Sequence, residues 1–140
     1  MKDKVLIAED EVGHLIPIKD YLEDKDFEII WVKDIEELNE KAQDADIIIV
    51  DVRLPMKFGD RVVIDDNNGI KAVAELFNNN QLKPKTPLIF ISMYTETEDV
   101  CQKELRKWNI KPECYRWLQK PFEMESLTDR IYEQLKVLRS

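Results

Sequence analysis

Five short apolar runs alternate along this chain with segments of helical period, and this alternation constrains the fold more than any other feature. The runs cover residues 4–8, 27–32, 46–50, 87–92 and 114–118. Nearly continuous apolar character over five or six residues is typical of strands that are buried on both faces. Strands that alternate with helices indicate right-handed βαβ units. The sequence therefore predicts one α/β domain, with a parallel five-stranded sheet between two layers of helices.

The segments between the runs have the apolar spacing of amphipathic helices. In the first of them, Pro17 interrupts the hydrogen-bond ladder unless it lies in the first turn. Asp34 is expected to cap the second helix, with Glu37 completing a capping box. Thr95 and Glu98 are expected to cap the fourth. The buried faces are predicted to carry Leu15, Ile18 and Leu22; Ile70, Val73, Ala74 and Phe77; Cys101, Leu105 and Trp108; and Leu127, Ile131, Leu135 and Leu138.

The charge of the chain argues against two classes of partner. Its 140 residues carry a net charge of −8 at pH 7. An acidic surface repels phosphate backbones and anionic lipids, so we expect neither nucleic acid nor membrane as a direct partner. The sequence has no signal-peptide pattern, no apolar stretch of membrane-spanning length and no CxxC pair. These features predict a cytoplasmic protein with reduced thiols.

Polar residues follow the apolar runs at positions that a parallel sheet brings together. Glu9 and Asp10 follow the first run, Asp51 follows the third, Ser92 ends the fourth, and Lys120 lies just beyond the fifth. All of them fall at the carboxyl edge of the sheet, where ligands bind in this class of fold. Crowded carboxylates repel one another, and all-oxygen ligation without Cys or His suits Mg²⁺. Together with a serine and a lysine that can contact phosphoryl oxygens, the set predicts an aspartate that accepts a phosphoryl group.

Four short motifs in this order give the sequence a family resemblance. They are "AEDE" (8–11), "DVRLP" (51–55), "FIS" (90–92) and "LQKPF" (118–122). With these motifs the chain resembles the receiver domains of two-component response regulators. The resemblance implies a flavodoxin-like (βα)5 three-layer sandwich of strand order 2-1-3-4-5, and we expect residues 1–140 to form a single receiver domain.

The resemblance also implies a role for each site residue. Asp51 is the expected phosphoacceptor, and a histidine kinase or a histidine phosphotransfer protein is expected to supply the phosphoryl group. Mg²⁺ is the expected cofactor. Ser92 and Lys120 are expected to contact the phosphoryl group. The expected metal ligands are Glu9, Asp10, Asp51 and the backbone carbonyl of Arg53; Pro121 is expected to follow a cis peptide bond, and Ser92 and Trp117 are expected to act as the switch residues.

The implied function is a signalling switch that binds a downstream effector protein, and not an enzyme with a dedicated substrate. A phosphorylation-dependent dimer is compatible with it. Two alternatives stay open on the sequence. One is a receiver-like module that binds its partner constitutively. The other is a phosphatase of the haloacid dehalogenase type, against which Arg53 argues, because those enzymes carry a second aspartate at that position.

The chain departs from the family pattern in several places. Residues 56–68 form an insertion after the third strand, in which "RVVI" (61–64) could make an extra strand. Its "DDNNG" segment lacks the first ligand of an EF-hand, because Ile64 stands there. Met93 replaces a small residue beside the phosphoryl site, and Trp117 replaces a Tyr or Phe. His14, the only histidine, is interpreted as a surface or packing residue.

Overall fold

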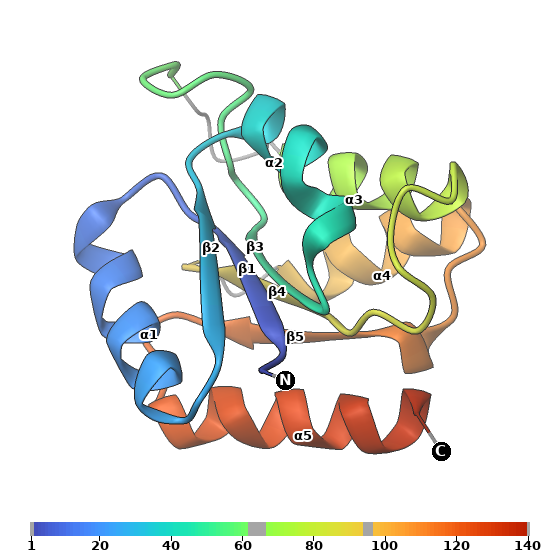
Figure 1. Cartoon of the computed structure of the whole chain (residues 1–140). Coiled ribbons are helices and arrows are strands. Elements are labelled where there is room, and N and C mark those ends of the chain that lie inside the picture. The colour runs from blue at the N-terminus through green and yellow to red at the C-terminus, as the bar shows by residue number, and fades with distance from the viewer. Residues whose placement is uncertain (1, 62–66, 94–96, 140) are drawn as a thin grey trace.

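The computed structural model, which describes residues 2–61, 67–93 and 97–139, contains one parallel sheet of order β2-β1-β3-β4-β5 (Figure 1). This confirms the predicted flavodoxin-like fold. The strands are β1 (Lys4–Ala8), β2 (Glu28–Val32), β3 (Ile47–Asp51), β4 (Leu88–Ser92) and β5 (Tyr115–Gln119). The helices are α1 (Val12–Asp24), α2 (Ile35–Lys41), α3 (Asn68–Asn78), α4 (Thr97–Lys107) and α5 (Met124–Leu138), with short 3₁₀ turns at Ala42–Asp44 and Pro112–Cys114. No helix within the described ranges has both the length and the apolar character needed to cross a membrane.

The strand side chains alternate between two separate apolar layers. Ile48 and Val50 of β3 point toward α2, α3 and α4, whereas Ile47 and Ile49 point toward α1 and α5. Figure 1 shows the same division, with α1 and α5 on one side of the sheet and the other three helices opposite. All four side chains are fully buried. The continuous apolar run therefore fills two cores at once, as expected for a central parallel strand.

Several predicted element boundaries were wrong by one residue. Phe27 was predicted to open β2, but its amide donates to the Leu22 carbonyl (3.1 Å) and closes the end of α1. Asp26 turns the chain there with a φ of 68°. Cys114 was predicted to open β5, but its amide closes the preceding 3₁₀ turn on Lys111. At both places a local turn, invisible in the apolar pattern, takes the amide that the strand would have used.

The predicted cap of α2 is present with a modified partner. The Asp34 Oδ1 atom accepts a hydrogen bond from the Glu37 amide (2.8 Å). The Glu37 carboxylate returns to the amide of Lys33, one residue before the cap (2.8 Å). Asp34 Oδ2 also accepts from the amide of Phe58 (2.9 Å), and the Lys33 ammonium lies 5.3 Å from the centre of the Phe58 ring. The cap of α2 thus also fixes the first part of the 56–68 segment.

The predicted helices are present, and one assignment to a buried face is wrong. Phe77 was assigned to the buried face of α3, but it is 37% exposed, and Leu76 lies in the core instead. Pro17 lies in the second turn of α1, where a proline cannot donate a hydrogen bond to the carbonyl four residues earlier. The predicted cap residue Thr95 and most of the predicted extra strand at 61–64 lie outside the described residues, and the side chain of Glu98 is not described either.

Candidate phosphoryl-transfer site

Strand alternation directs three of the predicted site residues to the same side of the sheet. Glu9 continues the row of Val5 and Ile7 beyond β1, and Asp51 continues the row of Ile47 and Ile49. Each row faces the layer of α1 and α5, and Lys120 follows Leu118 into that layer. Because β1 and β3 are neighbours in the sheet, the two carboxylates come from adjacent strand ends. The alternation of side chains along each strand therefore decides which polar residues lie on the same face of the sheet and can contact one another.

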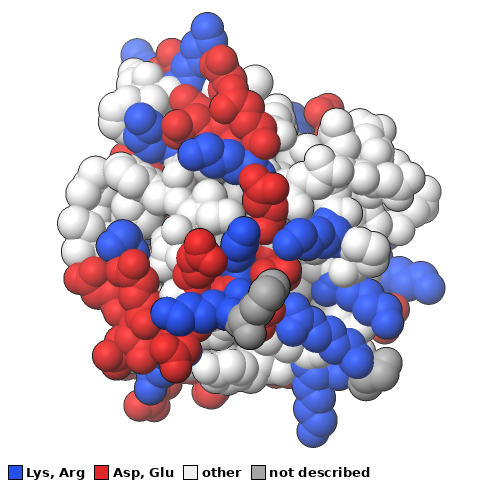
Figure 2. Space-filling view, in the orientation of Figure 1, with Lys and Arg blue, Asp and Glu red and all other residues white. Residues whose placement is uncertain are grey.

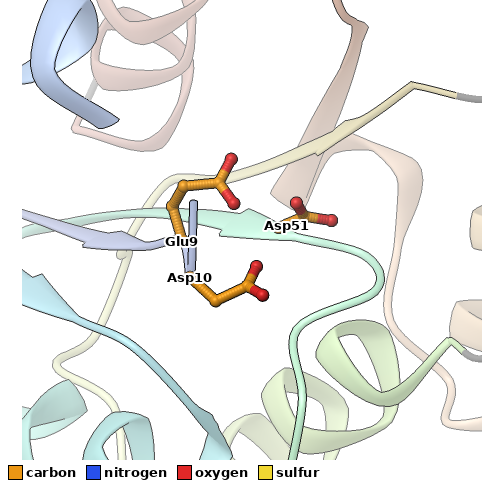
Figure 3. A group of neighbouring side chains, drawn as sticks. All are labelled: Glu9, Asp10 and Asp51. Carbon is orange, nitrogen blue, oxygen red and sulfur yellow. The ribbon is translucent and has the colours of Figure 1, made fainter. Parts of the chain in front are cut away.

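Glu9, Asp10 and Asp51 form an acidic cluster that could hold a cation. One carboxylate oxygen of each lies within 4.8 Å of the others. Figure 3 shows the three side chains directed into one space at the ends of β1 and β3. Burial, and then the charge of Asp51, raise the pKa of Glu9 to about 8. Burial also raises the pKa of Asp10. Negative charge is therefore costly here, and a bound divalent cation would relieve that cost.

Lys120 is the cation that the structure itself supplies to this cluster. Its ammonium donates to Asp51 Oδ2 (2.9 Å) and forms a close ion pair with Glu9. Burial alone would lower the pKa of Lys120, but the charges of Asp51 and Glu9 outweigh it and raise that pKa. The lysine is 9% exposed and is held charged beside the predicted phosphoacceptor. The peptide bond between Lys120 and Pro121 is cis.

The second oxygen of Asp51 faces Arg53. Asp51 Oδ1 accepts a hydrogen bond from the Arg53 amide (2.9 Å). The guanidinium of the same residue donates from Nη1 to Ser92 Oγ (2.8 Å). Ser92 is 1% exposed at the end of β4, the strand next to β3. The Asp51 carboxylate therefore accepts from the Lys120 ammonium at one oxygen and from the Arg53 backbone amide at the other.

Gly69 packs directly against the backbone of Asp51. Its amide donates to the Val52 carbonyl (2.9 Å). A Cβ atom at this position would lie 2.2 Å from the Asp51 carbonyl oxygen. No larger residue fits without displacing that backbone. The start of α3 therefore touches the site even though the 56–68 segment separates the two in sequence.

Two residues at the site were missed or undervalued by the sequence analysis. His14 was interpreted as a surface or packing residue, yet its Nδ1 atom lies 3.1 Å from the Lys120 ammonium and 3.6 Å from a Glu9 oxygen. Trp31 donates from Nε1 to the Glu9 carbonyl (2.8 Å). The spacing of His14, one turn into the helix that follows "AEDE", could have suggested that it faces the site.

Met93 does not fill the space beside Ser92. Its side chain is 56% exposed and lines a hollow of about 240 Å³ beside the site. The walls of this hollow also include His14 and Pro17 from α1 together with Lys120 and Phe122. Trp117 is half-buried and packs on the core layer of α2, α3 and α4. The hollow extends from Lys120 along the first half of α1.

The surface charge is mixed on the face that Figure 2 shows. Acidic side chains gather over the end of α1, and lysines and arginines lie across the centre and toward the lower right. The net charge of −8 is therefore not spread evenly over this face. A field of one sign that would steer a nucleic acid is absent from it.

Comparison with known proteins agrees with this geometry. Residues 5–132 match the response regulator receiver domain family. The chain belongs to this family. A search among curated proteins found no significant match. The matched residues run from β1 into α5 and so include nearly the whole sheet of this receiver domain.

Solved structures show the same fold at low sequence identity. A CheY-like receiver domain protein from Methanospirillum hungatei is 18% identical, with a TM-score of 0.74 over 99% of this chain and 98% of that one. The receiver domain of a modulated diguanylate cyclase from Desulfovibrio desulfuricans is 24% identical, with a TM-score of 0.71 over 99% and 98%. NtrX from Brucella abortus is 20% identical, with a TM-score of 0.74; the match covers 99% of this chain but only 28% of NtrX. The NtrX match therefore places a domain of this fold within a longer chain.

Proposed function

We propose that this receiver domain accepts a phosphoryl group on Asp51 from a phosphohistidine of a histidine kinase or a phosphotransfer protein. The P–N bond of the donor breaks, a P–O bond forms to an Asp51 carboxylate oxygen, and the donor histidine leaves with the electron pair of the broken bond. The observation that carries this proposal is the position of Asp51, 2.9 Å from the Lys120 ammonium and in one cluster with the carboxylates of Glu9 and Asp10.

Each residue has a distinct part in this reaction. The rigid strand β3 holds Asp51 with its side chain 13% exposed, so that the carboxylate is fixed and still accessible. Lys120 supplies positive charge where negative charge accumulates on the phosphoryl oxygens. Ser92 supplies a hydroxyl at the neighbouring strand end. Ser92 would move toward the phosphoryl group, and the Trp117 side chain would then change position. These two movements would transmit the signal to an effector protein.

The acidic cluster fits Mg²⁺ by the chemistry of its donors. All three side chains offer oxygen, the ligand that Mg²⁺ prefers, and burial together with the charge of Asp51 makes ionisation of Glu9 costly, which raises its pKa to about 8. Glu9, Asp10, Asp51 and the Arg53 backbone carbonyl would hold the ion. When bound, it would neutralise charge on the acceptor and on the incoming phosphoryl group.

The test is phosphorylation of the purified chain with acetyl phosphate and Mg²⁺. We expect about one acid-stable, hydroxylamine-labile phosphoryl group per chain, and none after chelation with EDTA. Asp51→Asn should take up none. Asp26→Asn is the matched control, because this exposed aspartate lies in the turn before β2 and should leave uptake unchanged. Uptake by Asp51→Asn equal to that of the wild type would overturn the proposal.

The same material separates a switch from a constitutive binding module. Beryllofluoride with Mg²⁺ imitates the phosphorylated aspartate, and a switch requires two states that it populates differently. We expect the backbone amide signals of β4 and β5 to shift in NMR spectra when it binds. Binding without any change beyond the immediate site would instead favour the constitutive module.

We also infer that residues 1–140 form one receiver domain in which 56–68 is an insertion. The segment begins after Leu54 and Pro55, which follow β3, and its first part is fixed by the hydrogen bond between the Phe58 amide and Asp34. The chain then returns to the sheet at Gly69, against Asp51. Replacing residues 57–67 by a short linker should keep the fold and the phosphorylation if this interpretation is right.

A further inference from the structure

We infer that the guanidinium of Arg53 is a direct ligand of the phosphoryl group on Asp51, in addition to Lys120. This inference rests on the proposed function, because it assigns a further contact at the same site. The sequence analysis gave Arg53 only a backbone role as a metal ligand. The structure shows its side chain folded back across the site.

The first argument is the course of Arg53 itself. Its amide donates to Asp51 Oδ1 (2.9 Å), which fixes the start of the residue beside the reactive carboxylate. Its Nη1 atom then reaches Ser92 Oγ (2.8 Å) on the adjacent strand. The side chain thus bridges the ends of β3 and β4. A phosphoryl group that is bonded to Asp51 and contacts Ser92 must occupy the same gap.

The second argument is the charge of the phosphorylated site. With a divalent cation bound, Glu9 and Asp10 contribute two negative charges and the phosphoryl group contributes about two more. The metal ion and Lys120 supply three positive charges. Arg53 supplies the fourth, and it is half-buried rather than extended into solvent. Its charge would make the phosphorylated site close to neutral.

The third argument is the geometry of the donor. A guanidinium presents several N–H groups in a planar fork that suits phosphoryl oxygens, and it cannot lose its charge. The bond to Ser92 uses the serine oxygen as an acceptor. On a phosphoryl group that contacts both residues, one oxygen could accept from the Ser92 hydroxyl and from the Arg53 guanidinium. Arg53 would position the serine and also touch the group that it binds.

The experiment compares two ligands on the same variants, Mg²⁺ alone and beryllofluoride in the presence of saturating Mg²⁺, both followed by tryptophan fluorescence. Arg53→Gln should weaken beryllofluoride binding by about tenfold to a hundredfold, the usual range for a lost charge-assisted hydrogen bond. Binding of Mg²⁺ alone should stay equal or become tighter, because a positive charge is removed. Arg53→Lys keeps the charge without the planar fork, so its affinity for beryllofluoride should lie between those of the wild type and Arg53→Gln. Arg106→Gln, in the last turn of α4, is the matched control and should change neither.

The possible outcomes are distinct. If Arg53→Gln weakens both ligands equally, the side chain has a structural role only, and the inference is wrong. If Arg53→Gln binds beryllofluoride as the wild type does, the inference is also wrong, although the proposed function stands. If the wild type itself binds no beryllofluoride and takes up no phosphoryl group, the proposed function fails first.

Discussion

Gly69 gives the sharpest test of how the fold supports the site. In Gly69→Ala, the new Cβ atom would lie 2.2 Å from the Asp51 carbonyl oxygen and 3.1 Å from the Val52 carbonyl oxygen. Ordinary carbon–oxygen contacts begin near 3.4 Å, so the helix start and the strand end must separate by about 1 Å. Both neighbouring groups are backbone atoms and cannot rotate away.

The expected cost follows from the contacts that this shift would weaken. The Gly69 amide bonds to the Val52 carbonyl (2.9 Å), and the Leu54 amide bonds to the Asp51 carbonyl (3.1 Å). Overpacking of a tight contact costs about 1–3 kcal/mol, and a weakened hydrogen bond about 1 kcal/mol more. Alanine recovers less than about 1 kcal/mol through its better helix propensity. We therefore expect Gly69→Ala to lower the free energy of unfolding by about 2–3 kcal/mol.

The assay is urea denaturation followed by tryptophan fluorescence, with Gly13→Ala as the matched control. With a slope near 2 kcal/mol per molar urea, the midpoint of Gly69→Ala should fall by about 1–1.5 M. Gly13 is also near the start of a helix, but a Cβ atom there would meet nothing within 4 Å. Its alanine variant should be equal to the wild type or more stable by up to about 1 kcal/mol. Equal midpoints for the two alanine variants would refute the reasoning.

Three further predictions concern a helix cap, the acidic cluster and a surface ion pair. Asp34→Ala removes the cap of α2 and the acceptor of the Phe58 amide. It should lower the free energy of unfolding, measured by urea denaturation, by about 1–2 kcal/mol and increase proteolysis near Phe58. Unchanged stability would contradict this prediction. Burial and the charge of Asp51 raise the pKa of Glu9 to about 8, so protons compete with Mg²⁺ for this carboxylate below that pH. The Mg²⁺ affinity measured by calorimetry should therefore rise by up to about tenfold per pH unit toward pH 8 and then level off. An equally steep pH dependence in Glu9→Gln would show that Glu9 does not cause it. Burial alone would raise the pKa of Asp46, but its hydrogen bonds and its ion pair with Lys83 outweigh this and lower that pKa below 3.8. The stability that Asp46 contributes is therefore present at neutral pH and lost as the pH falls through the lowered pKa, so Asp46→Asn should be less stable than the wild type at pH 7 by about 1 kcal/mol and equal to it near pH 2.

The sequence was sufficient for the architecture and for most of the residues at the site. The run "DIIIV" (46–50) predicted a strand covered on both faces, because only such a strand buries four successive branched side chains, and β3 is observed at Ile47–Asp51. The order of acidic pair, aspartate, serine and lysine along the chain then placed these residues at one edge, since parallel strands all end there. These predictions depend on periodicity and order, which are properties of the chain itself.

Element ends were less predictable, because local hydrogen bonds decide them. Phe27 is as apolar as the strand it precedes, and only the turn at Asp26 assigns its amide to the end of α1. Phe77 matched the helical spacing of Ile70, Val73 and Ala74, but it is 37% exposed, whereas Leu76 is buried. Apolar spacing fixes the width of a buried stripe more firmly than its edges.

By itself, the sequence determined that Asp51 ends a buried strand and shares its edge of the sheet with the other site residues. The tertiary structure alone decided which side chains bracket it. His14 of α1 reaches Lys120, which follows β5, Arg53 reaches Ser92 because β3 and β4 are neighbours, and Gly69 meets the Asp51 carbonyl although an insertion precedes it. Such contacts depend on the positions of atoms from separate elements. No local pattern in the chain encodes those positions.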